Sequence, residues 1–153
     1  MILGIHHVSL ATTDLARLRR FYCEILQFEV ISQFEWSNRV DLDRFVGFAD
    51  SAGRSAMLRL GDAFIELFEY RRPQPHDTPR RLCDPGYAHV ALLVRDIDGE
   101  YQRLHAAGVE FNSEVTDSGK LRAVYGRDPD GNVFELVEVT SPASRYAPSS
   151  GAT

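Results

Sequence analysis

The sequence predicts an α+β fold built from two βαβββ modules, residues 5–70 and residues 88–139. Three observations lead to this prediction. The chain has 153 residues, of which 44% are hydrophobic and 25% charged, an ordinary composition for one domain or two small halves with a core. The two halves carry the same motifs in the same order. A segment rich in proline and arginine, residues 71–87, separates them and is interpreted as a linker.

The internal repeat is the most informative of these observations. The segment HVSLATTDL, which begins at His7, matches HVALLVRDI, which begins at His89, and in each copy an aspartate follows the histidine by seven residues. Near the end of each copy, FIELFE matches VFELVE, which pairs Glu66 with Glu135. Each half therefore carries a histidine on its predicted first strand and a glutamate on its predicted last strand.

The first module is expected to begin with a strand at residues 5–12, where apolar and polar residues alternate. A helix should follow, with Asp14 as its N-cap. The apolar face of this helix is formed by Leu15, Leu18, Tyr22 and Ile25. Three further strands are expected at residues 28–36, 55–60 and 63–70.

The second module is expected to begin with a strand in AHVALLVRD and to continue with a short helix in GEYQRLHAAG that ends at a glycine. Strands are then predicted at residues 109–115, 120–126 and 132–139. The last residues, 140–153, contain little that could be buried and are expected to form a flexible tail.

Composition excludes several classes of partner. The formal net charge is −5, and the arginine clusters are short and interrupted, so no nucleic acid is expected as a partner. No apolar run approaches the roughly 20 residues that cross a membrane, and the first residues lack the pattern of a signal peptide. We therefore expect a cytoplasmic protein without membrane contact. Two cysteines, Cys23 and Cys83, are too few for a disulfide framework, and Cys23 is expected to be a buried thiol.

Strand geometry separates the two adjacent histidines near the start of the chain. Side chains alternate along a strand, so His6 should share the helix-covered face and His7 should point to the open face of the sheet. His7 has a counterpart in the repeat and His6 has none. Glu66, between large apolar residues, would be costly to bury without a cation or a hydrogen-bonding partner. The four recurring residues are therefore candidate metal ligands.

These motifs resemble those of the vicinal oxygen chelate superfamily, which includes glyoxalase I, methylmalonyl-CoA epimerase, extradiol dioxygenases, and the fosfomycin and bleomycin resistance proteins. The resemblance covers residues 5 to about 140 and rests on HHVSLATTDL, FYCEILQFEV, FIELFEY, GYAHVALLV and RDPDGNVFELVE. It implies that the sheets of the two modules form an open, cup-shaped mixed sheet. It also implies the metal ligands, which are His7, Glu66, His89 and Glu135.

Such a ligand set would neutralise a divalent cation and occupy four of about six coordination positions. The metal could be Zn, Ni, Co, Mn, Mg or Fe. A small carbonyl substrate could chelate the cation through neighbouring oxygens, so that the resulting enolate is stabilised. The resemblance thus implies a metal-dependent lyase or isomerase, in which Glu135 or Glu66 acts as the catalytic base. The sequence does not decide between the two glutamates.

Tyr125 raises the alternative of an extradiol dioxygenase, because it precedes Glu135 by ten residues, much as an acid–base tyrosine does in those enzymes. Residues 113–124 lack the additional histidine that the dioxygenases carry, and Glu66 would be superfluous in a two-histidine, one-carboxylate iron site. A lyase or isomerase is therefore favoured. Tyr125 is either a third catalytic side chain or an ordinary strand tyrosine.

The substrate is expected to be a small molecule, hydrophobic or aromatic, because Phe64, Phe68 and Tyr70 share the strand face of Glu66. These rings could equally be core residues. The asparagine that grips glutathione in glyoxalase I is missing after Glu66, which argues against that substrate. A drug-binding protein of the bleomycin-resistance type, without catalysis, is a further alternative. The resemblance also implies a homodimer, in which the modules pair within one chain or between chains.

Overall fold

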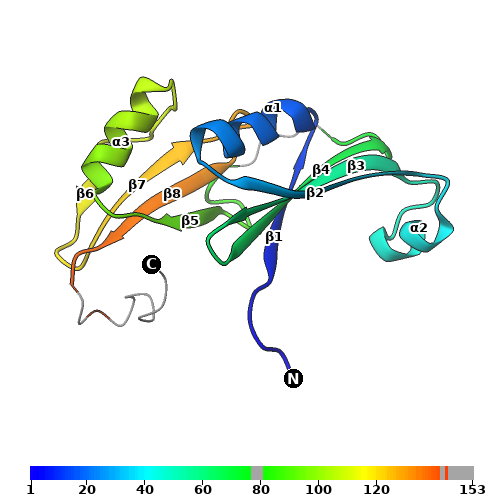
Figure 1. The fold of residues 1–153 in the computed structure, drawn as a ribbon, viewed down its shortest axis with the longest axis horizontal. Coiled ribbons are helices and arrows are strands. Elements are labelled where there is room, and N and C mark those ends of the chain that lie inside the picture. Colours follow the sequence, from blue (N-terminus) through cyan, green and yellow to red (C-terminus); the bar gives the residue numbers. More distant parts are fainter. Residues whose placement is uncertain (77–80, 142–143, 145–153) are drawn as a thin grey trace. The chain divides into compact units, whose positions relative to one another are not determined.

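The structure, a computed structural model, describes residues 1–76, 81–141 and 144. The chain divides into two compact units, residues 1–78 and residues 79–153. Each unit contains one four-stranded sheet (Figure 1).

In the first unit the predicted helix consists of two consecutive segments, and one further helix is present that the βαβββ order lacks. Its elements are β1 (His7–Thr12), α1 (Leu15–Arg20), the π-helix η1 (Phe21–Ile25), β2 (Glu29–Ser37), α2 (Val40–Val46), β3 (Ala52–Leu60) and β4 (Ala63–Arg72). The strand order in the sheet is β1-β4-β3-β2. β1 runs parallel to β4, whereas β4, β3 and β2 are antiparallel neighbours, so the sheet is mixed.

The second unit repeats this topology. Its elements are β5 (His89–Leu93), α3 (Ile97–Ala106), β6 (Thr116–Asp117), β7 (Leu121–Arg127) and β8 (Val133–Val139). The strand order is β5-β8-β7-β6, with β5 parallel to β8 and the other pairs antiparallel. The predicted α+β fold of two βαβββ modules is therefore confirmed.

The aspartates of the repeat begin the first helix of each unit. The Asp14 carboxylate accepts a hydrogen bond from the backbone N–H of Arg17 (3.0 Å), and the Asp96 carboxylate accepts one from Gly99 (3.1 Å). Both satisfy N–H groups that have no partner within the helix. The N-cap predicted at Asp14 is thus confirmed, and Asp96 is its counterpart.

Alternating burial along the last strands determines which residues face the helices. Ile65 and Leu67 of β4 are buried, and α1 packs against β3 and β4. In the second unit Phe134 and Leu136 of β8 are buried, and α3 packs against β8. Because side chains alternate, the glutamate between each of these pairs points to the sheet face without a helix.

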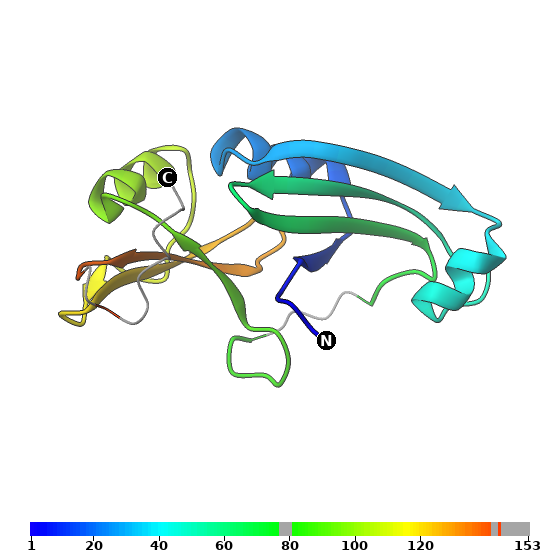
Figure 2. The ribbon, with the colours of Figure 1, turned by 60° about the horizontal axis from the view of Figure 1, so that its bottom comes forward.

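The structure differs from the sequence prediction at α2, which was not predicted. This helix follows β2 and connects it to β3 (Figure 2). It buries none of its residues, and its N-cap, Arg39, makes no side-chain cap. Gly47 ends it in the left-handed conformation, but this signal alone does not predict a helix without a buried face. Phe45, on this helix, is 84% exposed.

A second difference concerns residues 109–115, which were predicted to form a strand. They make only one isolated bridge, between Phe111 and Gly126, and the edge strand β6 contains just Thr116 and Asp117. The segment EFNSEV includes the pair Asn112 and Ser113, which interrupts the apolar alternation needed for a half-buried strand.

Several boundaries also differ slightly. β3 begins at Ala52 instead of residue 55, and β4 continues to Arg72, two residues into the predicted linker. Most of the predicted tail and linker residues 77–80 lie outside the described residues. Cys23 is half-buried in η1, where burial raises the pKa of its thiol, and Cys83 is exposed.

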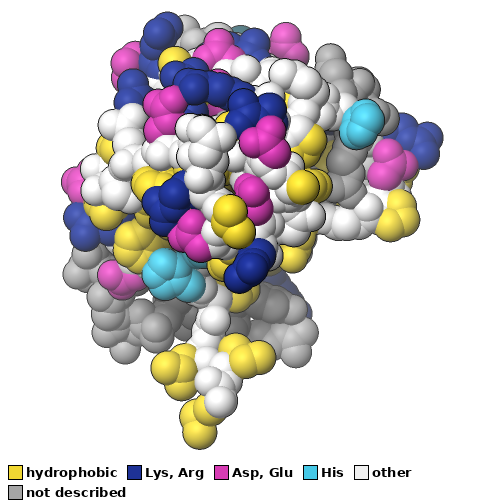
Figure 3. All heavy atoms as spheres, turned by 90° about the vertical axis from the view of Figure 1, so that its right-hand side faces the viewer, with side chains coloured by type: hydrophobic (Ala, Val, Ile, Leu, Met, Phe, Trp, Pro, Cys, Tyr) yellow, Lys and Arg dark blue, Asp and Glu magenta, His cyan; other side chains and the backbone are white. Residues whose placement is uncertain are grey.

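The charges on the surface and the lengths of the helices concern two partners that the sequence argues against, nucleic acid and membrane. On the face drawn in Figure 3, aspartate and glutamate side chains lie next to the lysine and arginine side chains. No helix in the described part of the chain is long and apolar enough to span a membrane.

Candidate functional site

The first unit brings together His7 and Glu66. In the parallel ladder of β1 and β4, His7 is paired with Phe64 and Ser9 is paired with Glu66. His7 and Glu66 therefore lie on the same face of the sheet, offset by two residues along the strands. The His7 Nε2 atom lies 3.4 Å from Glu66 Oε2, and the Glu66 side chain is 20% exposed. Burial raises the pKa of Glu66, and the nearby His7 offsets part of this effect.

The second unit brings together His89 and Glu135 in the same register. His89 lies beside Val133 and Ala91 beside Glu135 in the ladder of β5 and β8. The His89 Nε2 atom lies 3.1 Å from Glu135 Oε2, and the Glu135 side chain is 19% exposed. The repeat seen in the sequence therefore extends to the strand register and to the atoms that face each other.

The spacing of the donor atoms fits two ligands of one cation. With metal–ligand distances of about 2.1 Å, neighbouring ligands lie about 3.0 Å apart in an octahedral site and about 3.4 Å apart in a tetrahedral one. The distances in the two pairs are 3.4 and 3.1 Å. Within the described residues, no third His, Cys, Asp or Glu side chain joins either pair to make a group of three. Each unit thus supplies two donors.

Tyr125 lies beside the second pair. It is directly opposite Glu135 in the ladder of β7 and β8, and its ring centroid lies 5.0 Å from that of His89. The corresponding position in the first unit, opposite Glu66, is occupied by Met57. The two pairs therefore differ in their neighbour on the adjacent antiparallel strand, which is a tyrosine opposite Glu135 and a methionine opposite Glu66.

An aromatic cluster lies on the same sheet face as Glu66. The rings of Phe68 and Tyr70 stack at 5.7 Å, and Trp36 contacts both rings edge-on. Phe48, which follows α2, contacts Tyr70. Burial raises the pKa of the Tyr70 hydroxyl, and the charge of Glu66 raises it further. Sequence alternation identified Phe68 and Tyr70, but Trp36 and Phe48 come from other elements and could not be placed by it.

The structure corrects the placement of His6. The expectation that it shares the helix-covered face is wrong, because β1 begins only at His7 and the alternation of the strand does not extend to His6. The His6 Nδ1 atom lies 2.8 Å from His7 Nδ1, and the His6 ring stacks on Phe64 at 5.2 Å.

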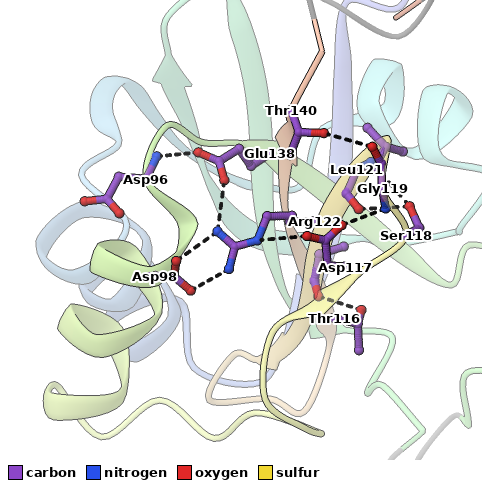
Figure 4. Close-up of polar contacts among 11 residues, drawn as sticks. Asp96, Asp98, Thr116, Asp117, Ser118, Gly119, Leu121, Arg122, Glu138 and Thr140 are labelled. Carbon is purple, nitrogen blue, oxygen red and sulfur yellow. Dashed lines mark hydrogen bonds and ion pairs between the residues drawn. The ribbon is translucent and has the colours of Figure 1, made fainter.

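A second pair of glutamates in the repeat, Glu69 and Glu138, was not predicted to have a role. Glu138 accepts a hydrogen bond from the backbone N–H of Asp96 and forms an ion pair with Arg122 (Figure 4). Arg122 forms a second ion pair with Asp98. Glu69 likewise accepts from the backbone N–H of the first residue of α1 (2.7 Å) and from Arg54 (2.8 Å). Each glutamate ties the last strand to the start of a helix. The signal was present in the sequence, where ELFE matches ELVE.

Comparisons with known proteins identify relatives over most of the chain. YaeR of Escherichia coli K12, an uncharacterized protein, is 30% identical over 135 residues, which are 88% of this chain and 95% of YaeR. The 2-epi-5-epi-valiolone epimerase of an Actinomyces species is 31% identical over an alignment of 154 positions, which covers 92% of this chain and 81% of the epimerase.

Solved structures show the same fold. A glyoxalase family protein from Bacillus cereus superposes with a TM-score of 0.81 at 24% identity, over 92% of this chain and 97% of that protein. The fosfomycin resistance protein FosX of Listeria monocytogenes, in a complex with Mn(II) and sulfate, superposes with a TM-score of 0.60 at 24% identity, over 92% of this chain and 95% of FosX. A model of one protein family matches residues 4–136. The chain therefore belongs to the Glyoxalase/Bleomycin resistance protein/Dioxygenase superfamily.

Proposed function

We propose that this protein is a divalent-metal-dependent lyase or isomerase that acts on a small carbonyl substrate by proton transfer. The observation that carries the proposal is the recurrence of a His–Glu pair at the same strand register in both units, with donor atoms 3.4 and 3.1 Å apart. One pair could be an ordinary surface ion pair. Two pairs in equivalent positions of a duplicated fold favour a shared task.

Together, the two pairs would hold one cation through His7, Glu66, His89 and Glu135. Two imidazole nitrogens and two carboxylates suit Zn, Ni, Co, Mn, Mg or Fe, and the two carboxylates balance the charge of a divalent ion. The pairs would come from the two modules of one chain or from two chains of a homodimer. When bound, the cation would supply a Lewis acid for the oxygens of the substrate.

The side chains around the pairs would perform the proton transfer and hold the substrate. Glu135 or Glu66 would accept a proton from the carbon next to the carbonyl group, and burial, which raises the pKa of Glu66, makes that carboxylate a stronger base. The Tyr125 hydroxyl, beside Glu135, would donate a hydrogen bond to an oxygen of the substrate. Phe68 and Tyr70 would contact a hydrophobic or aromatic part of the substrate. The similarity to an epimerase supports an isomerase in particular.

Metal content of the purified protein tests the ligand set. In elemental analysis, we expect the wild type to retain one divalent ion for each set of the four proposed ligands. We expect the His7→Ala and His89→Ala variants to lose this ion. His76→Ala is the matched control, because His76 is exposed and lies outside both pairs. Equal metal content in all three variants would contradict the ligand set.

Isotope exchange tests the reaction. The protein would be incubated in deuterated water with a 2-oxo aldehyde hemithioacetal, a 2-substituted acyl-CoA and 2-epi-5-epi-valiolone. Deuterium at the carbon next to the carbonyl group supports the proposal. Oxygen uptake without deuterium incorporation would identify a dioxygenase instead, and tight ligand binding by metal-free protein without turnover would identify a drug-binding protein.

A further inference from the structure

The two adjacent histidines make a contact that the second unit lacks. The Nδ1 atoms of His6 and His7 lie 2.8 Å apart, at hydrogen-bond distance, and the two rings are nearly perpendicular, with an interplanar angle of 87°. The other ring nitrogen of His7, Nε2, faces Glu66 at 3.4 Å. Both nitrogens of His7 are therefore engaged.

This contact restricts where the proton of a neutral His7 ring can reside. A hydrogen bond between two Nδ1 atoms needs one donor and one acceptor, and each neutral imidazole carries a single N–H group. If His7 is to offer the Nε2 lone pair to a cation, its proton must be on Nδ1, and His6 Nδ1 must accept it. We propose that His6 is a positioning residue that selects this tautomer and orientation of His7. The inference rests on the metal-binding function proposed above.

The surroundings of His6 hold it in place for this role. Its ring stacks on Phe64 with a centroid distance of 5.2 Å and an interplanar angle of 3°. Phe64 is the register partner of His7 in β4, so one aromatic side chain fixes the His6 ring next to the ligand. The remaining nitrogen, His6 Nε2, then carries the proton of the neutral His6 ring.

The second unit serves as an internal comparison. Ala88 precedes His89 where His6 precedes His7, and Val133 occupies the position of Phe64. The accepting imidazole and the ring that supports it are thus both present in the first unit and both absent from the second. The second unit thus forms the same sheet topology without such a stack. This points to a role at the ligand.

Two substitutions separate hydrogen bonding from packing. His6→Ala removes both the acceptor and the stack, whereas His6→Phe keeps an aromatic ring over Phe64 but has no acceptor. We expect both variants to bind Zn²⁺ or Mn²⁺ about 10- to 100-fold more weakly in calorimetric titrations, the usual effect of losing such a partner. His76→Ala should bind as the wild type does. Wild-type affinity in His6→Phe would assign His6 a packing role only and overturn the proposal.

Nitrogen-15 NMR of the metal-free protein provides the second readout. At a pH of about 8.5, well above the ordinary histidine pKa, the His7 ring should carry its proton on Nδ1 in the wild type and lose this preference in both His6 variants. His89 should give the same signals in all three proteins. An unchanged His7 tautomer would refute the role of His6. If the wild type binds no cation, the metal function fails, but the tautomer measurement still decides whether His6 controls His7.

Discussion

Tyr125 stands directly opposite Glu135 on the neighbouring strand, and its ring packs against His89 at a centroid distance of 5.0 Å. Met57 takes the equivalent position opposite Glu66. The two His–Glu pairs are thus alike, but the residues opposite their glutamates are not, since a thioether cannot donate a hydrogen bond and a phenol can. A phenol hydroxyl opposite the glutamate is therefore present at the Glu135 pair and is replaced by a thioether at the Glu66 pair.

Replacing Tyr125 by phenylalanine tests this asymmetry. The variant keeps the ring against His89, so fold and metal content should be unchanged, while kcat should fall by about 10²-fold or more if the hydroxyl transfers or orients a proton. Met57→Leu is the control and should change kcat little. Wild-type turnover in Tyr125→Phe would make Tyr125 an ordinary strand residue.

The two glutamates are distinguished by the same conservative change. Glu135→Gln and Glu66→Gln each keep an oxygen ligand but lose a basic carboxylate, so metal binding should weaken moderately in both. Turnover should drop by about 10²–10⁴-fold only in the variant that lacks the base. A large loss of turnover in both variants would indicate that one glutamate removes a proton and the other delivers a proton to the opposite face of the same carbon, as in an epimerase. Comparable, small losses would exclude a carboxylate base.

Metal removal should lower the thermal stability of the protein. At free metal 100 times above Kd, binding adds about 2.7 kcal/mol to the free energy of unfolding. For a chain of this size this corresponds to a Tm increase of about 5–10 °C. We expect EDTA to abolish the increase in a thermal-shift assay, and His7→Ala to show none. The exposed control His76→Ala should respond as the wild type does.

Glu69 should stabilise the first unit in a pH-dependent way. Burial raises its pKa, but hydrogen bonds from Arg54 and from the backbone N–H of Leu15 outweigh this and hold the pKa below its ordinary value. A lowered pKa means that the stabilisation is complete above the unfolded pKa of about 4.3 and disappears as the pH falls through the folded value. Glu69→Gln should therefore cost about 1–3 kcal/mol at pH 7 in urea unfolding. The difference from wild type should shrink below about pH 4. A constant difference between pH 7 and pH 3 would contradict this assignment.

Gly126 tests the packing of the second unit. A Cβ atom at this position would lie 2.5 Å from Phe134 Cζ and 3.1 Å from Phe111 Cε1, and Phe134 is buried. Gly126→Ala should therefore destabilise the protein by about 1–3 kcal/mol, as overpacking does. Gly4→Ala, with no atom within 4 Å of the added Cβ, should have no effect in the same chemical denaturation experiment.

Most of the fold was predictable because the signals are local and duplicated. Alternation around Ile65 and Leu67 places Glu66 on the sheet face without a helix, and the aspartate caps mark the starts of the first helices of both modules. What escaped prediction lacked such a signal. α2 has no buried face, and residues 109–115 lose their alternation at Asn112 and Ser113.

The candidate site was only partly predictable from the sequence. The repeat pointed to the four pair residues, but the strand register that brings the atoms of each pair within 3.4 Å or less depends on long-range pairing. His6 was misplaced because a strand rule was applied one residue beyond the strand. The rings of Trp36 and Phe48 reach Tyr70 from β2 and from the loop after α2, which sequence spacing does not reveal.

The parallel pairing of first with last strand has a consequence for folding. In each module the histidine enters with the opening strand and the glutamate only with the closing strand, so neither pair exists in an incompletely synthesised module. A module that lacks its closing strand would lack its His–Glu pair, whatever the state of the other module. Each His–Glu pair therefore forms only when the closing strand docks beside the opening strand.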